Sequence, residues 1–79
     1  MKYNIAAVYK YPDAGYRPAR NLIVGNAYKV TGIYMGSSST TITLSGFQNE
    51  FNSVQFDFFE DGKPLDIYSD ARFNPWLRR

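Results

Sequence analysis

Short segments of alternating apolar and polar residues, separated by clusters of glycine, proline, asparagine and aspartate, limit most strongly how this 79-residue chain can fold. A period of two residues is that of a β-strand, whose successive side chains point to opposite faces of a sheet. The clearest segment is 2–11, in which one parity holds Tyr3, Ile5, Ala7, Tyr9 and Tyr11. The chain is therefore predicted to be mainly β.

The same pattern recurs along the chain and predicts further strands at 27–35, 40–47 and 51–59, with short apolar segments at 22–24 and 64–68. Gly32 interrupts the alternation and predicts a bulge. Pro64 cannot donate a ladder hydrogen bond, which favours an edge position for the last strand. Beyond it, residues 69–72 can form one helical turn, Pro75 would end it, and Trp76 and Leu77 would fold back onto the sheet.

A chain of this length is expected to hold a single domain over residues 1–79, because shorter domains are only marginally stable. About five short strands at this spacing favour a small closed barrel, since closure removes exposed strand edges. Large aromatic side chains must then supply much of the core.

Three segments resemble SH3 domains in order and spacing. Ala7-Val8-Tyr9-Lys10-Tyr11 resembles their A-L-Y-D-Y segment and is followed by a long loop, as their RT loop follows that segment. The stretch 22–30 is similar to their diverging turn, and 51–56 is similar to their F-P-S-N-Y-V segment. The resemblance implies a single SH3-like β-barrel with Tyr9 and Tyr11 as groove residues, or else as framework aromatics.

The chain departs from SH3 domains where they bind proline-rich peptides. Thr40 and Thr41 stand in the region of their conserved groove tryptophan, and Arg17 and Arg20 replace the acidic residues of their loop. Recognition of proline-rich peptides is therefore not expected.

A second resemblance involves the stretches 51–56, 59–62 and 70–75, which together look like short uncharacterised proteins of Gram-positive bacteria and their phages. It implies a compact phage or prophage accessory protein. Small phage proteins of this kind often bind or inhibit a host protein, including components of anti-phage defence.

The chain has no cysteine and no histidine, which removes the commonest nucleophile–base pairs and thiolate metal sites. The hydroxyls of residues 37–41 have no candidate base nearby, so we expect no enzyme and no cofactor. Four acidic residues could gather around a hard cation, but their spacing is not that of a calcium loop and fits a solvated turn better: Asp57, Glu60, Asp61 and Asp66. The absence of cysteine and of long apolar runs predicts an unprocessed, soluble, cytoplasmic protein.

Charge is unevenly distributed, although the net charge is only +2. Five cations and one acid give +4 over residues 1–29, six acids and one lysine give −5 over 50–70, and three arginines end the chain. Such a layout can orient a partner, or the charges can simply be solvated or paired within the fold.

Exposed aromatic and arginine residues are typical of protein-binding hot spots, so a non-catalytic protein-binding module is the function that we predict. The expected surface joins the long loop to the tail, and its members are Tyr9, Tyr11, Tyr16, Arg17, Arg20, Phe73, Trp76 and Arg78. For Trp76 the alternative is a lid over the barrel end. Two other functions stay open: a small barrel that binds single-stranded nucleic acid, and a structural protein that self-associates through the edge at 65–68.

Overall fold

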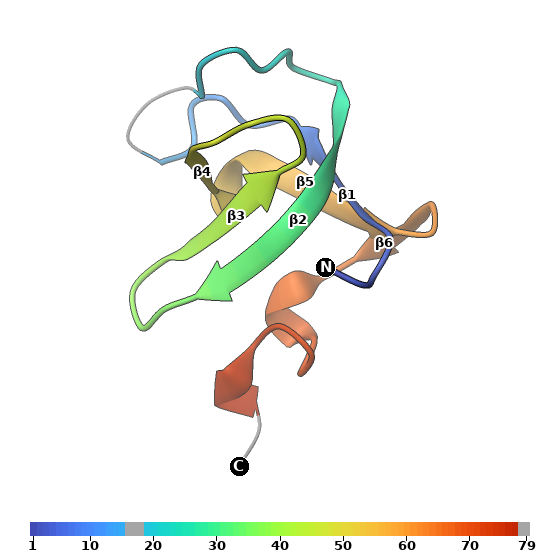
Figure 1. The fold of residues 1–79 in the computed structure, drawn as a ribbon. Helices are drawn as coiled ribbons and strands as arrows, with labels where there is room; N and C mark the ends of the chain where they lie inside the picture. Colours follow the sequence, from blue (N-terminus) through green and yellow to red (C-terminus); the bar gives the residue numbers. More distant parts are fainter. Residues whose placement is uncertain (16–18, 78–79) are drawn as a thin grey trace.

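The computed structural model describes residues 1–15 and 19–77, which are organised around one antiparallel sheet (Figure 1). Its strands are β1 (Ile5–Tyr9), β2 (Ala27–Met35), β3 (Thr40–Leu44), β4 (Glu50–Asn52), β5 (Phe56–Glu60) and β6 (Lys63–Leu65). Three short 3₁₀ helices complete the described chain: η1 (Ser53–Gln55), η2 (Ile67–Ser69) and η3 (Pro75–Leu77). The prediction of a mainly β chain is confirmed.

The strand order is β4-β3-β2-β1-β5-β6, so β4 and β6 form the two edges. Among the described residues no ladder joins these edges, and the sheet is therefore not closed into the predicted barrel. The sheet has six strands where about five were predicted. Both edges are short, with three residues each, and Pro64 removes one donor from β6.

The core lies on one face of the sheet, as the alternation in the first strand requires. Along β1, the side chains of Ile5, Ala7 and Tyr9 are buried while those between them are only half-buried. They pack with the remaining buried apolar residues: Val30, Ile42, Leu44, Phe51, Phe56, Phe58 and Ile67. A chain of ring contacts runs through this core from Tyr9 to Phe56 at 5.5 Å, and on to Phe51 and Phe58. Aromatic side chains thus supply much of the buried volume, as expected for so small a domain.

A bulge in β2 lies at the predicted position. The register against β3 shifts between Val30 and Gly32, and the long strand bends there (Figure 1). Gly32 is buried, and a Cβ at this position would lie 2.5 Å from the Tyr34 hydroxyl and 2.9 Å from Thr43 Oγ1. The glycine therefore lets the Tyr34 side chain lie back across its own strand.

Several predicted strands are shorter or interrupted in the structure. The strand predicted at 40–47 ends at Leu44, and 51–59 is not continuous, because η1 separates β4 from β5. The Asn52 side chain causes this break by accepting a hydrogen bond from the Val54 N–H at 3.3 Å, which caps η1 and turns Val54 outward. Similarly, the last strand ends at Leu65, because the Asp66 side chain caps η2. The edge proposed for self-association at 65–68 therefore contributes only Leu65 to a strand.

The end of the chain agrees with the prediction only in part. The predicted single turn is present, because the Asp70 carbonyl accepts from the Asn74 N–H at 2.8 Å and the Asp70 side chain accepts from the Arg72 N–H at 2.9 Å, but Pro75 then begins η3. Trp76 and Leu77 remain 55% and 51% exposed, so they neither fold back onto the sheet nor cover a barrel end.

Candidate partner-binding surfaces

The long connection between β1 and β2 forms one end of the molecule, which we call the loop end (residues 10–15 and 19–26 as described; Figure 1, top). Gln55 holds its first part. The backbone carbonyl of Gln55 accepts hydrogen bonds from the N–H groups of Lys10 and Tyr11, both at 3.0 Å. Its buried side-chain amide donates to the carbonyls of Pro12 and Ala14 at 3.3 and 3.0 Å. The beginning of this loop is thus fixed to the core.

Tyr9 is a framework residue. Its side chain is 2% exposed, and its hydroxyl accepts a hydrogen bond from the Ala19 N–H at 3.0 Å. Of the two interpretations offered by the sequence, the burial of the Tyr9 side chain favours the framework role.

Tyr11 lies at the surface, but its hydroxyl is already paired. It donates to both carboxylate oxygens of Asp57 at 3.0 and 3.1 Å, and this hydrogen bond raises the pKa of Tyr11. Lys10 Nζ lies 3.5 Å from the same carboxylate. Two residues of the basic and aromatic stretch that suggested nucleic-acid binding thus face an acid, which would repel a phosphate.

The second part of the loop end is a β-turn at 23–26. The Asn26 N–H donates to the Ile23 carbonyl at 3.1 Å, and Gly25 has a φ of 94°, which a type II turn requires at its third residue. Ile23 and Val24 at this turn are 63% and 56% exposed. Arg20 is exposed on the same connection, whereas the candidates Tyr16 and Arg17 lie outside the described residues.

The opposite end of the molecule, which we call the tail end, contains the described residues from 66 to 77 and the start of the chain. Arg72 is its centre. The Arg72 guanidinium forms two hydrogen bonds of 2.7 and 2.8 Å with the Glu60 carboxylate and is also bonded to Asp70. It lies over the rings of Tyr3 and Phe73, at 4.6 and 5.0 Å from their centroids. This arrangement holds the tail against β5 and the first residues of the chain.

The electrostatics at the tail end follow from these contacts. Hydrogen bonds from Arg72 lower the pKa of Glu60 and of Asp70, because they stabilise the ionised carboxylates. The same two partners raise the pKa of Arg72. The three groups therefore stay charged together at neutral pH.

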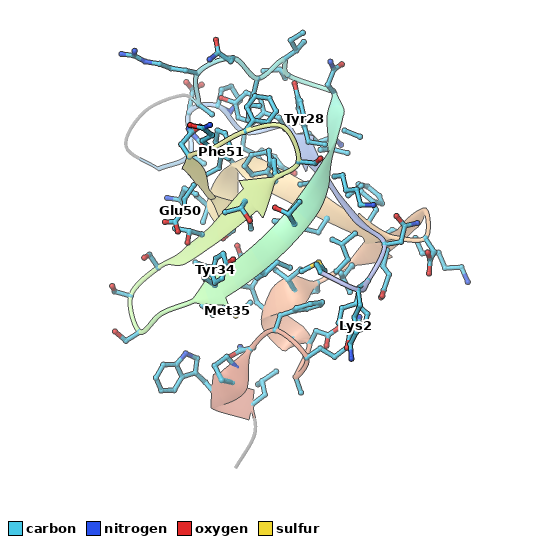
Figure 2. The ribbon with its side chains drawn as sticks, in the orientation of Figure 1. Lys2, Tyr28, Tyr34, Met35, Glu50 and Phe51 are labelled. Carbon is cyan, nitrogen blue, oxygen red and sulfur yellow. The ribbon has the colours of Figure 1, made fainter. Side chains whose placement is uncertain are left out.

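A groove separates the far half of β2 from the tail. Its lining is largely apolar and consists of Ile33, Tyr34, Met35, Ala71, Arg72, Phe73 and Pro75. Tyr34 is 55% exposed, and Figure 2 shows it beside Met35 on the lower half of β2. The candidate Phe73 is half-buried and contacts Tyr3 edge-on at 5.7 Å, while Trp76 and Leu77 directly follow Pro75 and are exposed. We refer to the groove together with Trp76 and Leu77 as the tail surface.

The sequence analysis expected the long loop and the tail to form one surface, but the structure does not bring them together. The two lie at opposite ends of the molecule, with the sheet between them (Figure 1). The candidates that can be placed thus fall on two separate surfaces: Tyr11 and Arg20 at the loop end, Phe73 and Trp76 at the tail end. Arg78 lies outside the described residues.

Each of the four acids considered as cation ligands has a structural partner. Asp57 pairs with Tyr11 and Lys10, Glu60 with Arg72, and Asp61 with the Asn4 amide at 3.1 Å. Asp66 accepts from the Tyr68 N–H and the Ser69 hydroxyl. Within the described part of the chain, no three acidic residues gather in a way that could hold a metal ion. The same part of the chain contains no helix long and apolar enough to cross a membrane.

Comparison with known proteins places the chain in a phage family. The family model of bacteriophage T4 protein Y07B matches residues 4–79. The chain belongs to this family. The matched region includes both the loop end and the tail end. No curated protein and no solved structure matches the chain significantly. The phage origin inferred from the sequence is thereby supported.

Sequence reasoning missed three exposed groups: the Ile23-Val24 turn, Tyr34 and Leu77. The signal for the first was present in Gly25-Asn26, a turn sequence directly after two aliphatic residues. The predicted bulge at Gly32 carried a signal for Tyr34, because a bulge that keeps Val30 and Ile33 on the inner face puts Tyr34 on the outer face.

Proposed function

We propose that this phage protein is a non-catalytic binding module that attaches to a host protein through the tail surface. It would act in the cytoplasm of the infected cell, with components of anti-phage defence among the candidate targets. The observation that carries the proposal is the exposure of Trp76 and Leu77 beside an apolar groove, on a tail that is held in place by Arg72.

The composition of the tail surface supports a protein partner. Tryptophan and tyrosine are the side chains most often found at interface hot spots, because each buries a large area at low conformational cost. Tyr34 and Trp76 provide two such side chains. A partner that bound here would find the groove already formed, since the contacts of Arg72 and Phe73 order the tail before binding.

We also propose that the fold is related to that of SH3 domains. The three resembling segments fall on β1, on the approach to β2, and on β4 with η1 and the start of β5. A long loop after the first strand and a bent second strand are consistent with that relationship. The groove proposed here lies between β2 and the tail, so it does not depend on Tyr9 or Tyr11.

Affinity capture from lysate of the host bacterium tests the proposal. The bait would be the tagged chain, alongside a Trp76→Ala/Leu77→Ala variant and a Val54→Ala control, since Val54 is 47% exposed away from the groove. We expect one host protein to be retained by the wild type and the control, and at least ~10-fold less of it by the double variant.

A parallel sample treated with nuclease distinguishes the alternative function. Equal retention of the host protein by all three baits would contradict the proposal. Loss of all retained material after nuclease treatment would instead favour binding to single-stranded nucleic acid.

A further inference from the structure

A second groove lies between the hairpin that joins β2 to β3 (Figure 1, lower left) and the helices η1 and η2. It is lined by residues 36–40, 52–54 and Tyr68, and its volume of about 630 Å³ is within the range usual for small-molecule sites. We propose that this groove binds a neutral saccharide, with the Tyr68 ring as the surface on which a sugar ring stacks. The groove shares no lining residue with the groove of the tail surface, and the proposal does not depend on the function proposed there.

Tyr68 is an exposed aromatic residue that the structure fixes in place. Its hydroxyl lies 2.6 Å from the hydroxyl of Ser53, which is itself 1% exposed. The Tyr68 N–H donates to the Asp66 carboxylate at 3.0 Å, and the Tyr68 carbonyl accepts from the Asn74 amide at 2.7 Å. The residue nevertheless remains 43% exposed. A ring fixed at its hydroxyl and at its backbone can receive the apolar C–H face of a ligand with little loss of conformational entropy.

The rest of the lining supplies neutral hydrogen-bonding groups. Residues 37–40 contribute four consecutive hydroxyl side chains, and within the described part of the chain none of these hydroxyls has a hydrogen-bond partner. Their hairpin is closed by the Gly36 N–H, which donates to the Ser39 carbonyl at 2.9 Å. The Asn52 side-chain oxygen accepts from the Val54 N–H, which leaves the amide N–H groups of Asn52 as donors. Hydroxyls that both donate and accept match the hydroxyls of a sugar.

The absence of charge from the described lining separates a saccharide from ionic ligands. Phosphates are bound by basic side chains and hard metal ions by carboxylates, and this lining contains neither. A nucleic-acid base could stack on Tyr68, but its phosphates would find no cation in the groove. Asp66, which caps η2 beside the groove, adds a negative charge that further disfavours an anion. The ligand that fits is uncharged.

The lining also differs from that of a typical protein interface. Serine is depleted at protein interfaces, whereas residues 37–39 and Ser53 place four serines around this groove. The tail surface provides the large apolar side chains that proteins bind, and here Tyr68 alone among the described lining residues is aromatic. One exposed ring beside several hydroxyls matches a sugar, which has an apolar face and a hydroxyl-rich edge.

An NMR titration of the ¹⁵N-labelled full chain with maltotriose and with triacetylchitotriose tests the inference. The variants are Tyr68→Ala, which removes the ring, and Ser38→Ala/Ser39→Ala, which removes two exposed hydroxyls without touching the core. Tyr11→Ala is the matched control, because Tyr11 is 46% exposed and its hydroxyl is likewise hydrogen-bonded, but it lies outside the groove. Thermal unfolding verifies that each variant is folded.

We expect at least one of the two saccharides to shift the amide signals of residues 36–40, 52–54 and Tyr68. Its affinity should fall at least ~10-fold in Tyr68→Ala and ~3-fold in the double serine variant, and should be unchanged in Tyr11→Ala. Because none of the described lining residues is charged, the affinity should also be the same at low and high salt.

The proposal is overturned if neither saccharide shifts these signals, if the shifts lie elsewhere, or if both groove variants bind like the wild type. It is also overturned if an oligothymidine strand or a blocked hexaproline peptide shifts the same signals while the saccharides do not, since the groove would then belong to a nucleic acid or a protein. Trp76 and Leu77 are unchanged in all these variants, so this proposal and that for the tail surface can each fail alone.

Discussion

The loop end and the tail end of this molecule are held by different kinds of interaction. At the loop end, backbone groups and the buried Gln55 amide tie the chain to the core. At the tail end, Arg72 joins two carboxylates and two rings near the surface, with its side chain 34% exposed. Neutral buried hydrogen bonds are insensitive to salt and moderate pH, whereas exposed ion pairs are screened and titrate. The anchoring of residues 10–15 by Gln55 should therefore change little with salt and pH, whereas the contacts of Arg72 at the tail end should weaken as salt is added or as pH falls.

The comparison is tested most strongly at Gln55. The change Gln55→Ala would leave the carbonyls of Pro12 and Ala14 without this donor, at a cost of ~1–3 kcal/mol in the free energy of unfolding. Urea unfolding would measure the cost, and hydrogen exchange should show lost protection in residues 10–15 while the tail keeps its own. Gln48→Ala, at an exposed glutamine, is the matched control and should be close to neutral. Equal effects of the two changes would refute the anchoring role of Gln55.

Two glycines allow the turn at the loop end to be compared with the β5–β6 turn at similar backbone cost. Gly25 and Gly62 have φ values of 94° and 82°, and a Cβ at either would meet no atom within 4 Å. Alanine at each should cost ~1–2 kcal/mol through left-handed backbone strain alone. Only Gly25→Ala should also disturb the Ile23-Val24 turn, which would appear as lost hydrogen-exchange protection of the Asn26 amide. Equal protection of this amide in both variants would show that the turn does not depend on the glycine.

The smallest expected effect concerns pH at the tail end. The folded pKa values of Glu60 and Asp70 are lowered by Arg72, so their stabilising contribution is complete above the unfolded pKa values, at roughly 4, and is lost as pH falls through the folded values. The Tm of the wild type should therefore decrease more steeply below about pH 5 than that of Arg72→Ala. Arg20→Ala, at an exposed arginine of the loop end, should keep the wild-type slope. Parallel curves for the wild type and Arg72→Ala would show that the ion pairs do not couple to folding.

The strands could be predicted from the sequence wherever one face is buried. The alternation of Ile5, Ala7 and Tyr9 and that of Ile42 and Leu44 assigned two strands and their inner faces, and Gly32 marked the bulge. These predictions succeeded because burial on one face imposes a period of two on the residues themselves. The breaks at η1 and η2 were missed, because the Asn52 and Asp66 side chains offer the backbone a local hydrogen bond that competes with the ladder.

The candidate surfaces were predicted less well than the strands. Composition indicated an aromatic protein-binding surface, yet it could not separate the buried Tyr9 from the exposed Trp76, nor show that loop and tail lie at opposite ends. By itself, the sequence determined the β class, the turns and the uneven charge, since these depend on residues that are neighbours along the chain. Only the tertiary structure decided that Arg72 meets Glu60 and Tyr3, and that the sheet stays open, because such contacts join residues far apart in the sequence.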